Sequence, residues 1–108
     1  MSKAPANKGI AIRMAEAVGY ADDAVISKTL LDKPTGTLTL FSFDAGQGLS
    51  EHTSPYDATV QILEGKAAIT IDGKTQEVSA GNLVIMPANV PHALKAEERF
   101  KMLLIMIR

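Results

Sequence analysis

From Val25 onward, short runs of apolar residues follow one another along the chain, separated by turn-forming residues. Within several runs apolar and polar side chains alternate, so that Ala67, Ile69 and Ile71 fall on one face of a predicted strand. Alternation with a period of two is typical of β-strands. Many short strands with turns roughly every 8–12 residues indicate an all-β sandwich or small barrel. The pattern predicts strands at Val25–Leu31, Thr37–Phe43, Ala58–Leu63, Lys66–Ile71, Thr75–Val78, Leu83–Met86, His92–Lys95 and Phe100–Ile107.

The segments between these runs carry recognisable turn residues. Asp72-Gly73 suits a type I′ hairpin turn, whose twist matches that of the flanking strands. Asp32 to Gly36 contains both Pro and Gly and predicts a second turn, and Ala45 to Ser50 predicts a glycine-containing loop. The apolar phase changes between Leu40 and Phe41, which predicts either a bulge or a strand buried on both faces.

The first 20 residues differ in pattern and predict a short N-terminal arm (residues 1–20) that precedes a barrel domain (residues 21–108). Met1 to Gly9 is polar and predicts a loose terminus, whereas Ile10 to Val18 fits either about two helical turns or an extended arm. The arm lacks the continuous apolar run of a signal peptide. The longest apolar run, Met102 to Ile107, is too short to cross a bilayer. We therefore expect a cytoplasmic protein that does not enter a membrane.

Composition narrows the class of protein further. A chain of 108 residues with 46% apolar and 21% charged residues is expected to form one globular domain. The net charge of -1 and the absence of a Lys/Arg cluster argue against a nucleic-acid partner. With no cysteine, the chain has no disulfide, no thiolate nucleophile and no Cys-ligated metal, which is compatible with a reducing cytosol.

Both histidines of the chain lie in two short stretches of similar design. One stretch runs from Gly46 through His52 to Gly65, and the other runs from Gly81 through Pro87 to His92. Each places a histidine near a glycine or proline turn, beside an apolar run that predicts a strand. A fold that brings the two stretches together therefore makes a binding site.

The spacing within these stretches resembles the two sequence motifs of the cupins, which are small double-stranded β-helix (jelly-roll) barrels. The motif positions fall on Gly46, His52, Ser54, Ala58 and Gly65, and on Gly81, Pro87, Asn89, His92 and Ala96. The resemblance covers Val25 to Ile107 and implies an all-β jelly-roll barrel. Asn89 replaces a motif glycine, which is a mild change because Asn tolerates the left-handed backbone conformation well.

The resemblance also shows which metal ligands are missing. In metal-binding cupins, two histidines and a glutamate of the first motif join the histidine of the second motif around one metal ion. Here Ser54 and Ala58 replace one histidine and the glutamate, so only His52 and His92 remain as metal candidates. Zinc sites use three or four protein ligands, so we expect at most a weakly held divalent ion (Zn, Ni, Mn or Fe). Glu51 and Asp57 neighbour the inward-facing positions and are expected to point away.

The expected pocket has a polar end and an apolar wall. His52, Ser54 and His92 form the polar end, with Ser54 also able to hold an imidazole by a hydrogen bond. Tyr56 is expected to shape the loop or to contact a ligand. Met86, Met102 and Met106 fit core filling or a pocket wall, two roles that merge in a barrel. The candidate ligand-binding residues are His52, Ser54, His92, Tyr56, Val60, Met86, Phe43 and Met102.

Three functions remain open on these residues. The leading hypothesis is a stand-alone cupin that binds a small organic ligand, with a weakly held metal at His52 and His92. The alternatives are a metal-dependent enzyme of the dioxygenase or isomerase type, which rests on family analogy, and a non-catalytic structural or sensor cupin. No Ser/His/Asp arrangement stands out, and the acidic residues are expected to be solvated loop charges, namely Asp22, Asp23, Asp44, Glu97 and Glu98.

A homodimer is expected as well. Phe100 to Ile107 has hardly any polar break, whereas a strand with one wet face should alternate. We therefore expect both faces of this strand to be covered, one by the barrel and the other by a partner or by the arm. The resemblance to cupins, which commonly pair in this way, implies that the partner is a second copy.

Overall fold

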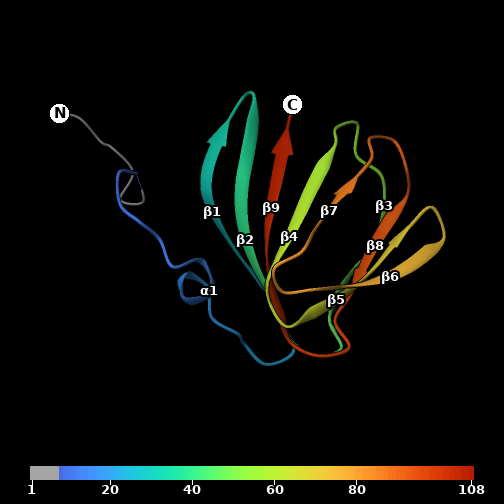
Figure 1. The fold of residues 1–108 in the computed structure, drawn as a ribbon, viewed down its shortest axis with the longest axis horizontal. Helices are drawn as coiled ribbons and strands as arrows, with labels where there is room; N and C mark the ends of the chain where they lie inside the picture. The colour runs from blue at the N-terminus through green and yellow to red at the C-terminus, as the bar shows by residue number, and fades with distance from the viewer. Residues whose placement is uncertain (1–7) are drawn as a thin grey trace.

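The computed structural model describes residues 8–108, so the expected loose terminus lies mostly outside the described residues. One short helix precedes nine strands, and two antiparallel sheets face each other (Figure 1). The elements are α1 (Met14–Ala17), β1 (Val25–Lys33), β2 (Gly36–Phe43), β3 (Gly48–His52), β4 (Ala58–Glu64), β5 (Lys66–Ile71), β6 (Lys74–Ser79), β7 (Leu83–Met86), β8 (His92–Lys95) and β9 (Phe100–Ile107).

The strand order is that of a jelly-roll barrel. One sheet has five strands in the order β1-β2-β9-β4-β7, and the other has four in the order β3-β8-β5-β6. The chain passes from one sheet to the other after β2, β3, β4, β6, β7 and β8, so sequence neighbours seldom pair. This confirms the predicted all-β fold and most of the predicted strand positions.

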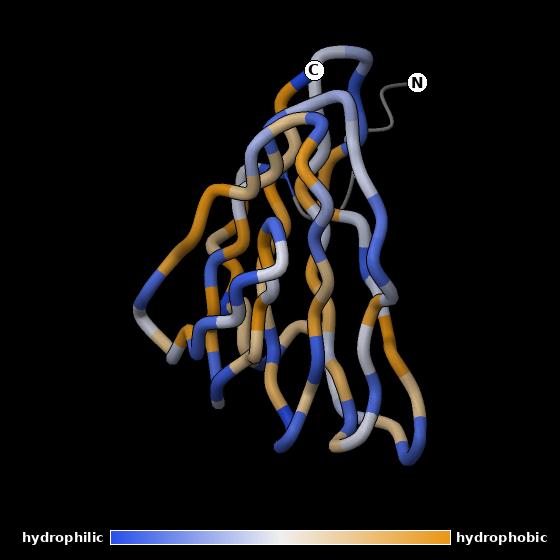
Figure 2. The backbone as a smooth tube through the Cα atoms, turned by 90° about the vertical axis from the view of Figure 1, so that its right-hand side faces the viewer, coloured by the Kyte–Doolittle hydropathy of each residue, from blue (hydrophilic) through white to orange (hydrophobic). Residues whose placement is uncertain are grey.

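The core lies between the sheets, where each strand directs alternate side chains. The rings of Phe43 and Phe100 stack with centroids 4.5 Å apart and are fully buried. Across from them, Ala67 and Ile69 of β5 are also fully buried, which confirms the predicted face of that strand. Figure 2 shows hydrophobic and hydrophilic stretches alternating along the strands, as this two-sheet arrangement requires.

Two turn predictions are confirmed by the backbone. Asp72 and Gly73 have φ angles of 51° and 77°, the pair of positive values that a type I′ turn needs. Asn89, at the motif glycine position, has φ of 63° and so uses the left-handed conformation. The hairpin between β1 and β2 turns at residues 34–35, within the predicted segment.

One local prediction needs correction, and one open alternative is decided. The predicted loop at Ala45 to Ser50 is in part strand, because Gly48 and Leu49 pair with β8. Gly48 approaches β8 so closely that a Cβ atom would lie 2.4 Å from the carbonyl oxygen of Leu94, which explains a glycine inside a strand. The phase change at Leu40 reflects burial of both faces of β2, since the irregularity of the β1–β2 ladder lies in β1, between Thr29 and Leu31.

The N-terminal arm covers part of the outer face of the five-stranded sheet. Its helix spans only Met14–Ala17, shorter than the two turns that were one prediction, and the chain then runs extended. Val18 is buried against Leu40 and Leu103 in a second, smaller apolar cluster. The arm therefore covers one end of β9, whereas Ile107 at the other end stays 70% exposed. Among residues 8–108, no helix is long and apolar enough to cross a membrane.

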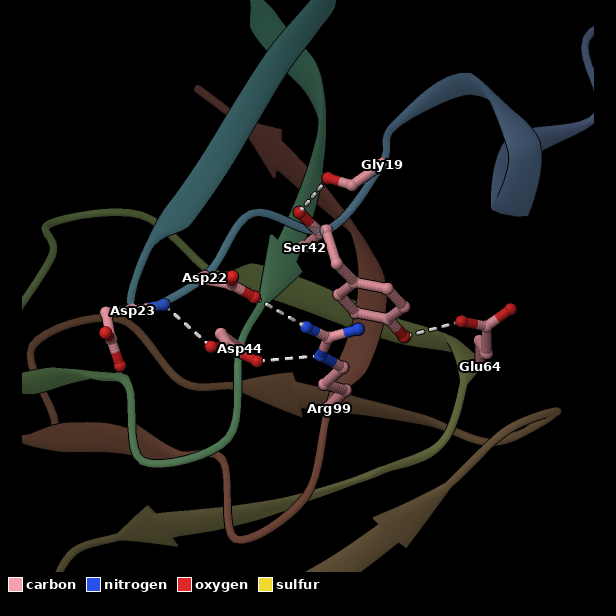
Figure 3. Close-up of polar contacts among 8 residues, drawn as sticks. Gly19, Asp22, Asp23, Ser42, Asp44, Glu64 and Arg99 are labelled. Carbon is pink, nitrogen blue, oxygen red and sulfur yellow. Dashed lines mark hydrogen bonds and ion pairs between the residues drawn. The ribbon is translucent and has the colours of Figure 1, made fainter.

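A polar cluster, here called the arm anchor, holds the arm to the barrel, and Figure 3 shows all of its members except Lys101. It consists of Tyr20, Asp22, Asp44, Glu64, Arg99 and Lys101. The Tyr20 ring lies 5.0 Å from the Arg99 guanidinium and 4.7 Å from the Lys101 ammonium, and its hydroxyl donates to Glu64 at 2.5 Å. Burial and this hydrogen bond to a carboxylate raise the pKa of Tyr20. The ammonium of Lys101 also donates to the carbonyl of Ala15 in the arm, at 2.6 Å.

The anchor corrects the expectation that Asp44 is a solvated loop charge. Arg99 donates from Nε to Asp44 at 2.7 Å and from Nη2 to Asp22 at 3.1 Å. The Asp44 side chain is only 14% exposed and also accepts the backbone N–H of Asp23. The hydrogen bond from Arg99 lowers the pKa of Asp44 below its ordinary value. The sequence pattern missed this because Asp44 and Arg99 lie 55 residues apart.

Candidate functional site

A cavity of about 110 Å³ lies between the two sheets of the barrel. Three polar residues, His52, Ser54 and His92, lie in its lining and come from β3, the following loop and β8. The other lining side chains are aliphatic or thioether groups, namely Leu49, Ala58, Met86, Leu94, Met102, Leu104 and Met106. The cavity is therefore apolar with one polar end, as the two histidine stretches predict.

A β-bulge brings the two histidines together. In the β3–β8 ladder Leu49 pairs with Leu94 and His52 pairs with His92, so β3 carries one residue more than β8 between these pairs. Regular pairing would instead place Glu51 opposite His92. Bulges of this kind re-aim side chains near binding sites. The extra residue makes imidazole, and not a carboxylate, the group that faces His92.

The two imidazoles contact each other through their Nε2 atoms, which lie 3.1 Å apart. Both Nδ1 atoms face backbone carbonyls: that of His52 lies 2.7 Å from Ser50 O, and that of His92 lies 3.2 Å from Val90 O. Since a carbonyl only accepts, each Nδ1 carries the hydrogen and donates it. Both Nε2 atoms are then lone-pair acceptors facing one another, an arrangement that a cation between them stabilises.

The two histidines differ in their surroundings. His92 is 3% exposed, whereas His52 is exposed and lies at the mouth of the cavity. Burial lowers the pKa of His92 below its ordinary value, since it disfavours the charged imidazolium, and neighbouring His52 lowers it further. The hydrogen bond to Val90 acts in the opposite direction but is the smaller effect.

Nearby acids do not reach the histidine pair. Asp57 accepts the backbone N–H of Ala88 at 2.8 Å and so supports the loop before β8, and Glu51 is exposed outside the lining. Within residues 8–108 no three His, Cys, Asp or Glu side chains are grouped so that they could hold a metal ion. The four-ligand site of metal-binding cupins therefore does not fit these residues. A divalent ion would have two imidazole nitrogens and little else.

Ser54 has a different partner from the expected one. Its Oγ accepts the backbone N–H of Tyr56 at 3.2 Å, and its carbonyl accepts the N–H of Asn89 at 2.7 Å. These bonds shape the loop and tie the two motif turns together, whereas the imidazoles bond to backbone carbonyls and to each other. Tyr56 is 40% exposed and lies outside the lining, so its side chain is not one of those that the fold brings into the cavity.

Most of the candidate ligand-binding residues meet in this cavity. His52, Ser54, Met86, His92 and Met102 line it, whereas Phe43 and Val60 are fully buried in the core outside the lining. The predicted set did not include three leucines that line the cavity. Their signal is the period of two, which continues from His92 to Leu94 and from Met102 to Leu104, and the pairing of Leu49 with Leu94.

Comparison with known proteins agrees with the fold. The family model Cupin_2, described as a cupin domain, matches residues 39–108, and the chain belongs to this family. A conserved protein of unknown function from Streptococcus pyogenes has a similar structure, with a TM-score of 0.88 and 41% identity over 93% of this chain and 88% of that one.

Two further relatives extend this result. A cupin 2 conserved barrel domain protein from Leptotrichia buccalis has a TM-score of 0.87 and 42% identity, and the match covers 90% of this chain and 47% of that one. An uncharacterized protein of Streptomyces coelicolor is 31% identical over 77 residues, which are 71% of this chain and 72% of that protein. These relatives establish the family and leave the ligand to be argued from the cavity.

Proposed function

We propose that this cupin binds a small organic molecule in the cavity between its sheets. The observation that supports this is a cavity with apolar walls that ends on two histidines and a serine. Ligand sites are typically apolar with a few well-placed polar groups. The volume of about 110 Å³ limits the occupant, since a cavity of about 150 Å³ holds benzene. The part of the ligand that lies inside the cavity is therefore no larger than a benzene ring.

The polar end of the cavity indicates which polar group the ligand carries. The Nε2 atoms of His52 and His92 accept hydrogen bonds when neutral and donate when protonated, and Ser54 lies beside them. A protonated pair would suit a carboxylate, and a neutral pair would suit a hydroxyl or a carboxylic acid. We therefore propose a short-chain carboxylic acid or alcohol, with its apolar body among the leucines and methionines.

A weakly held divalent ion, Zn, Ni, Mn or Fe, is the second candidate occupant, and with it a metal-dependent enzyme of the dioxygenase or isomerase type. The convergence of two Nε2 atoms at 3.1 Å favours it. The cavity lining offers no carboxylate among the described residues to complete the two-histidine, one-carboxylate set of non-haem iron enzymes. Binding without catalysis is therefore the function that the geometry supports best.

Elemental analysis and a thermal-shift screen test the proposal. Untagged protein, purified without chelators, should contain no stoichiometric Zn, Ni, Mn or Fe and should gain thermal stability with small carboxylic acids. Ala58→Leu, which fills the cavity, should abolish this gain, and Ala68→Leu on the other sheet, outside the cavity lining, should retain it. Stoichiometric Zn, Ni, Mn or Fe would favour the enzyme, and stabilisation by no small molecule would favour a structural or sensor role.

We also propose that the chain forms a homodimer through the outer face of the five-stranded sheet. Leu83 and Ile85 of edge strand β7 are each 57% exposed, and Ile107 of β9 is 70% exposed. Light scattering at micromolar concentration should show a dimer, which Leu83→Lys with Ile85→Lys should dissociate and Gln76→Lys on β6 should not. Deleting residues 1–20 should weaken the dimer if the arm crosses over. A monomeric wild-type protein would contradict the proposal.

The cytoplasmic location of the protein stays a prediction.

A further inference from the structure

Two methionines flank the position where metal-binding cupins carry their glutamate. On the five-stranded sheet, Ala58 of β4 pairs with Met86 of β7 on one side and with Met106 of β9 on the other. Residues directly opposite one another across antiparallel strands share a face, and all three line the cavity. The methionine Cα atoms are two strand spacings apart, about 10 Å. Two flexible thioether side chains can converge over the small alanine between them.

The histidine pair approaches the same cavity from the opposite sheet. The Nε2 lone pairs of His52 and His92 face each other at 3.1 Å, because both Nδ1 atoms are held by carbonyls. Two imidazole nitrogens bound to one tetrahedral metal ion at about 2.0–2.1 Å lie about 3.3–3.4 Å apart. The observed pair is thus close to the spacing of two ligands on one ion and needs little movement to accept it.

The imidazole nitrogens and thioether sulfurs of the cavity favour some metal ions over others. Thioether sulfur is a soft ligand that favours Cu(I), whereas Mn, Mg and Ca favour carboxylate, carbonyl and water oxygens. The lining carries no carboxylate among the described residues, so the full charge of a dication would stay uncompensated. The cost of removing an ion from water rises steeply with its charge, and a monocation suits this neutral, apolar cavity far better.

We propose that the cavity is a site for a soft monovalent metal ion, Cu(I), with His52, His92, Met86 and Met106 as ligands. Ser54 and Ala58 then mark a change in metal preference, in which thioethers from two neighbouring strands replace the missing imidazole and carboxylate. This site goes beyond the proposed function, because its occupant is an inorganic ion. It uses the same volume, so Cu(I) and a small organic ligand should exclude one another.

The competing explanation is that the methionines only fill the core, as Met commonly does. Leucine distinguishes the two, because it has a similar volume and no sulfur, and Met-to-Leu exchange is usually tolerated. The test is anaerobic titration of the purified chain with Cu(I) in ascorbate, against the chromogenic chelator bicinchoninate. The variants are Met86→Leu, Met106→Leu and their combination. Met14→Leu is the matched control, because Met14 lies in α1 and packs in the second cluster.

Wild-type protein and the Met14→Leu variant should bind one Cu(I) per chain with equal affinity. Each cavity variant should lose at least about tenfold, the combination at least about 100-fold, with Zn(II) affinity unchanged. X-ray absorption of the loaded wild type should show sulfur neighbours that the double variant lacks. Circular dichroism and thermal melts confirm that every variant is folded.

Three results would overturn the inference: no Cu(I) binding by the wild type, full Cu(I) affinity in the double variant, or an equal loss of Cu(I) and Zn(II) affinity. The small carboxylic acid screen separates this failure from failure of the proposed function. Acids that stabilise a protein unable to bind Cu(I) leave the proposed function standing alone. Thioether-dependent Cu(I) binding without stabilisation by any acid leaves the copper site standing alone.

Discussion

The cavity and the arm anchor both gather polar side chains from distant parts of the chain, but they satisfy them differently. In the anchor, Arg99 donates to two carboxylates, and the Tyr20 hydroxyl donates to a third. In the cavity, His52 and His92 direct two lone pairs at each other and lack a nearby acid. A cluster whose groups are paired among themselves is explained by stability. A pair that needs a cation or a ligand to complete it points to binding.

The position of the acids makes this contrast sharper. Asp44 and Glu64 lie in the anchor, where they pair with cations and hold the arm. Asp57, which precedes the motif position Ala58, supports the loop before β8 through the N–H of Ala88. Choosing the site by the number of charged residues would therefore select the anchor. Choosing it by polar groups that the fold leaves incompletely partnered selects the cavity, because only such groups are free to act on a ligand.

Giving the cavity the ligands that it lacks should produce the largest effect. Ser54→His with Ala58→Glu restores the ligand set of metal-binding cupins around His52 and His92. Raising the protein ligands from two to four should increase affinity for Zn, Ni or Mn by at least about 100-fold in calorimetry. Without metal, the double variant should melt at a lower temperature than the parent, because the cavity would hold an uncompensated carboxylate.

Ala68→Glu is the matched control, since Ala68 lies on β5, outside the cavity lining. It adds the same charge and should leave metal affinity unchanged. If the double variant gains no affinity, the cavity has been reshaped around a different occupant. The metal-dependent enzyme would then no longer be a candidate function.

Sequence pattern predicted the barrel well because its information is local. The period of two, the Asp72-Gly73 turn and the motif spacings around His52 and around His92 each depend on residues close together in the chain, and the structure agrees with them. The β3 bulge was not predictable in this way, since it exists only because β8 pairs alongside. The anchor was missed for the same reason, because Asp44 and Arg99 meet only where the ends of β2 and β9 pair. That Met86 and Met106 flank Ala58 could not be predicted either, because it depends on the order of the strands in the sheet.

Removing the aromatic ring of the anchor should lower stability without changing the cavity. Tyr20→Ala loses contacts with both Arg99 and Lys101 and the hydrogen bond to Glu64. The free energy of unfolding in urea should fall by about 1–3 kcal/mol. Tyr20→Phe keeps the ring and loses only the hydroxyl, so its loss should be about 0.5–1.5 kcal/mol. Thermal shifts by small acids should match those of the wild type in both variants.

Tyr20 should also make the stability of the protein depend on pH in the alkaline range. Because the pKa of Tyr20 is raised in the folded state, the unfolded chain ionises first, near pH 10, and stability should fall as the pH rises beyond that point. Tyr20→Phe should lose this part of the pH dependence. An Ala variant as stable as the wild type would show that the anchor is a consequence of the fold and contributes nothing to holding it.

The cavity should instead make the stability of the protein depend on pH in the acidic range. The pKa of buried His92 is lowered from 6.5, so the unfolded chain binds a proton more readily than the folded chain. Stability should therefore fall as the pH drops below about 6.5, by at most about 1.4 kcal/mol per pH unit, until His92 is protonated in the folded state too. In urea titrations from pH 7 to pH 5, the His92→Gln variant should lose this decrease in the free energy of unfolding. An unchanged slope would show that other groups control acid stability.

The smallest effect is expected at the turn that holds His92 beside His52. Asn89 has φ of 63°, and its N–H donates to the carbonyl of Ser54, so this turn couples the two motifs. Asn89→Gly should change the free energy of unfolding by less than about 0.5 kcal/mol, because glycine adopts positive φ without strain. Asn89→Ala should cost about 1 kcal/mol, because alanine lacks the local hydrogen bonding that lets Asn adopt this conformation. If the turn positions the histidine pair, Asn89→Ala should also reduce the stabilisation by small acids, whereas Asn89→Gly should preserve it. Equal ligand responses in both variants would show that the β3–β8 ladder alone sets the geometry of the pair.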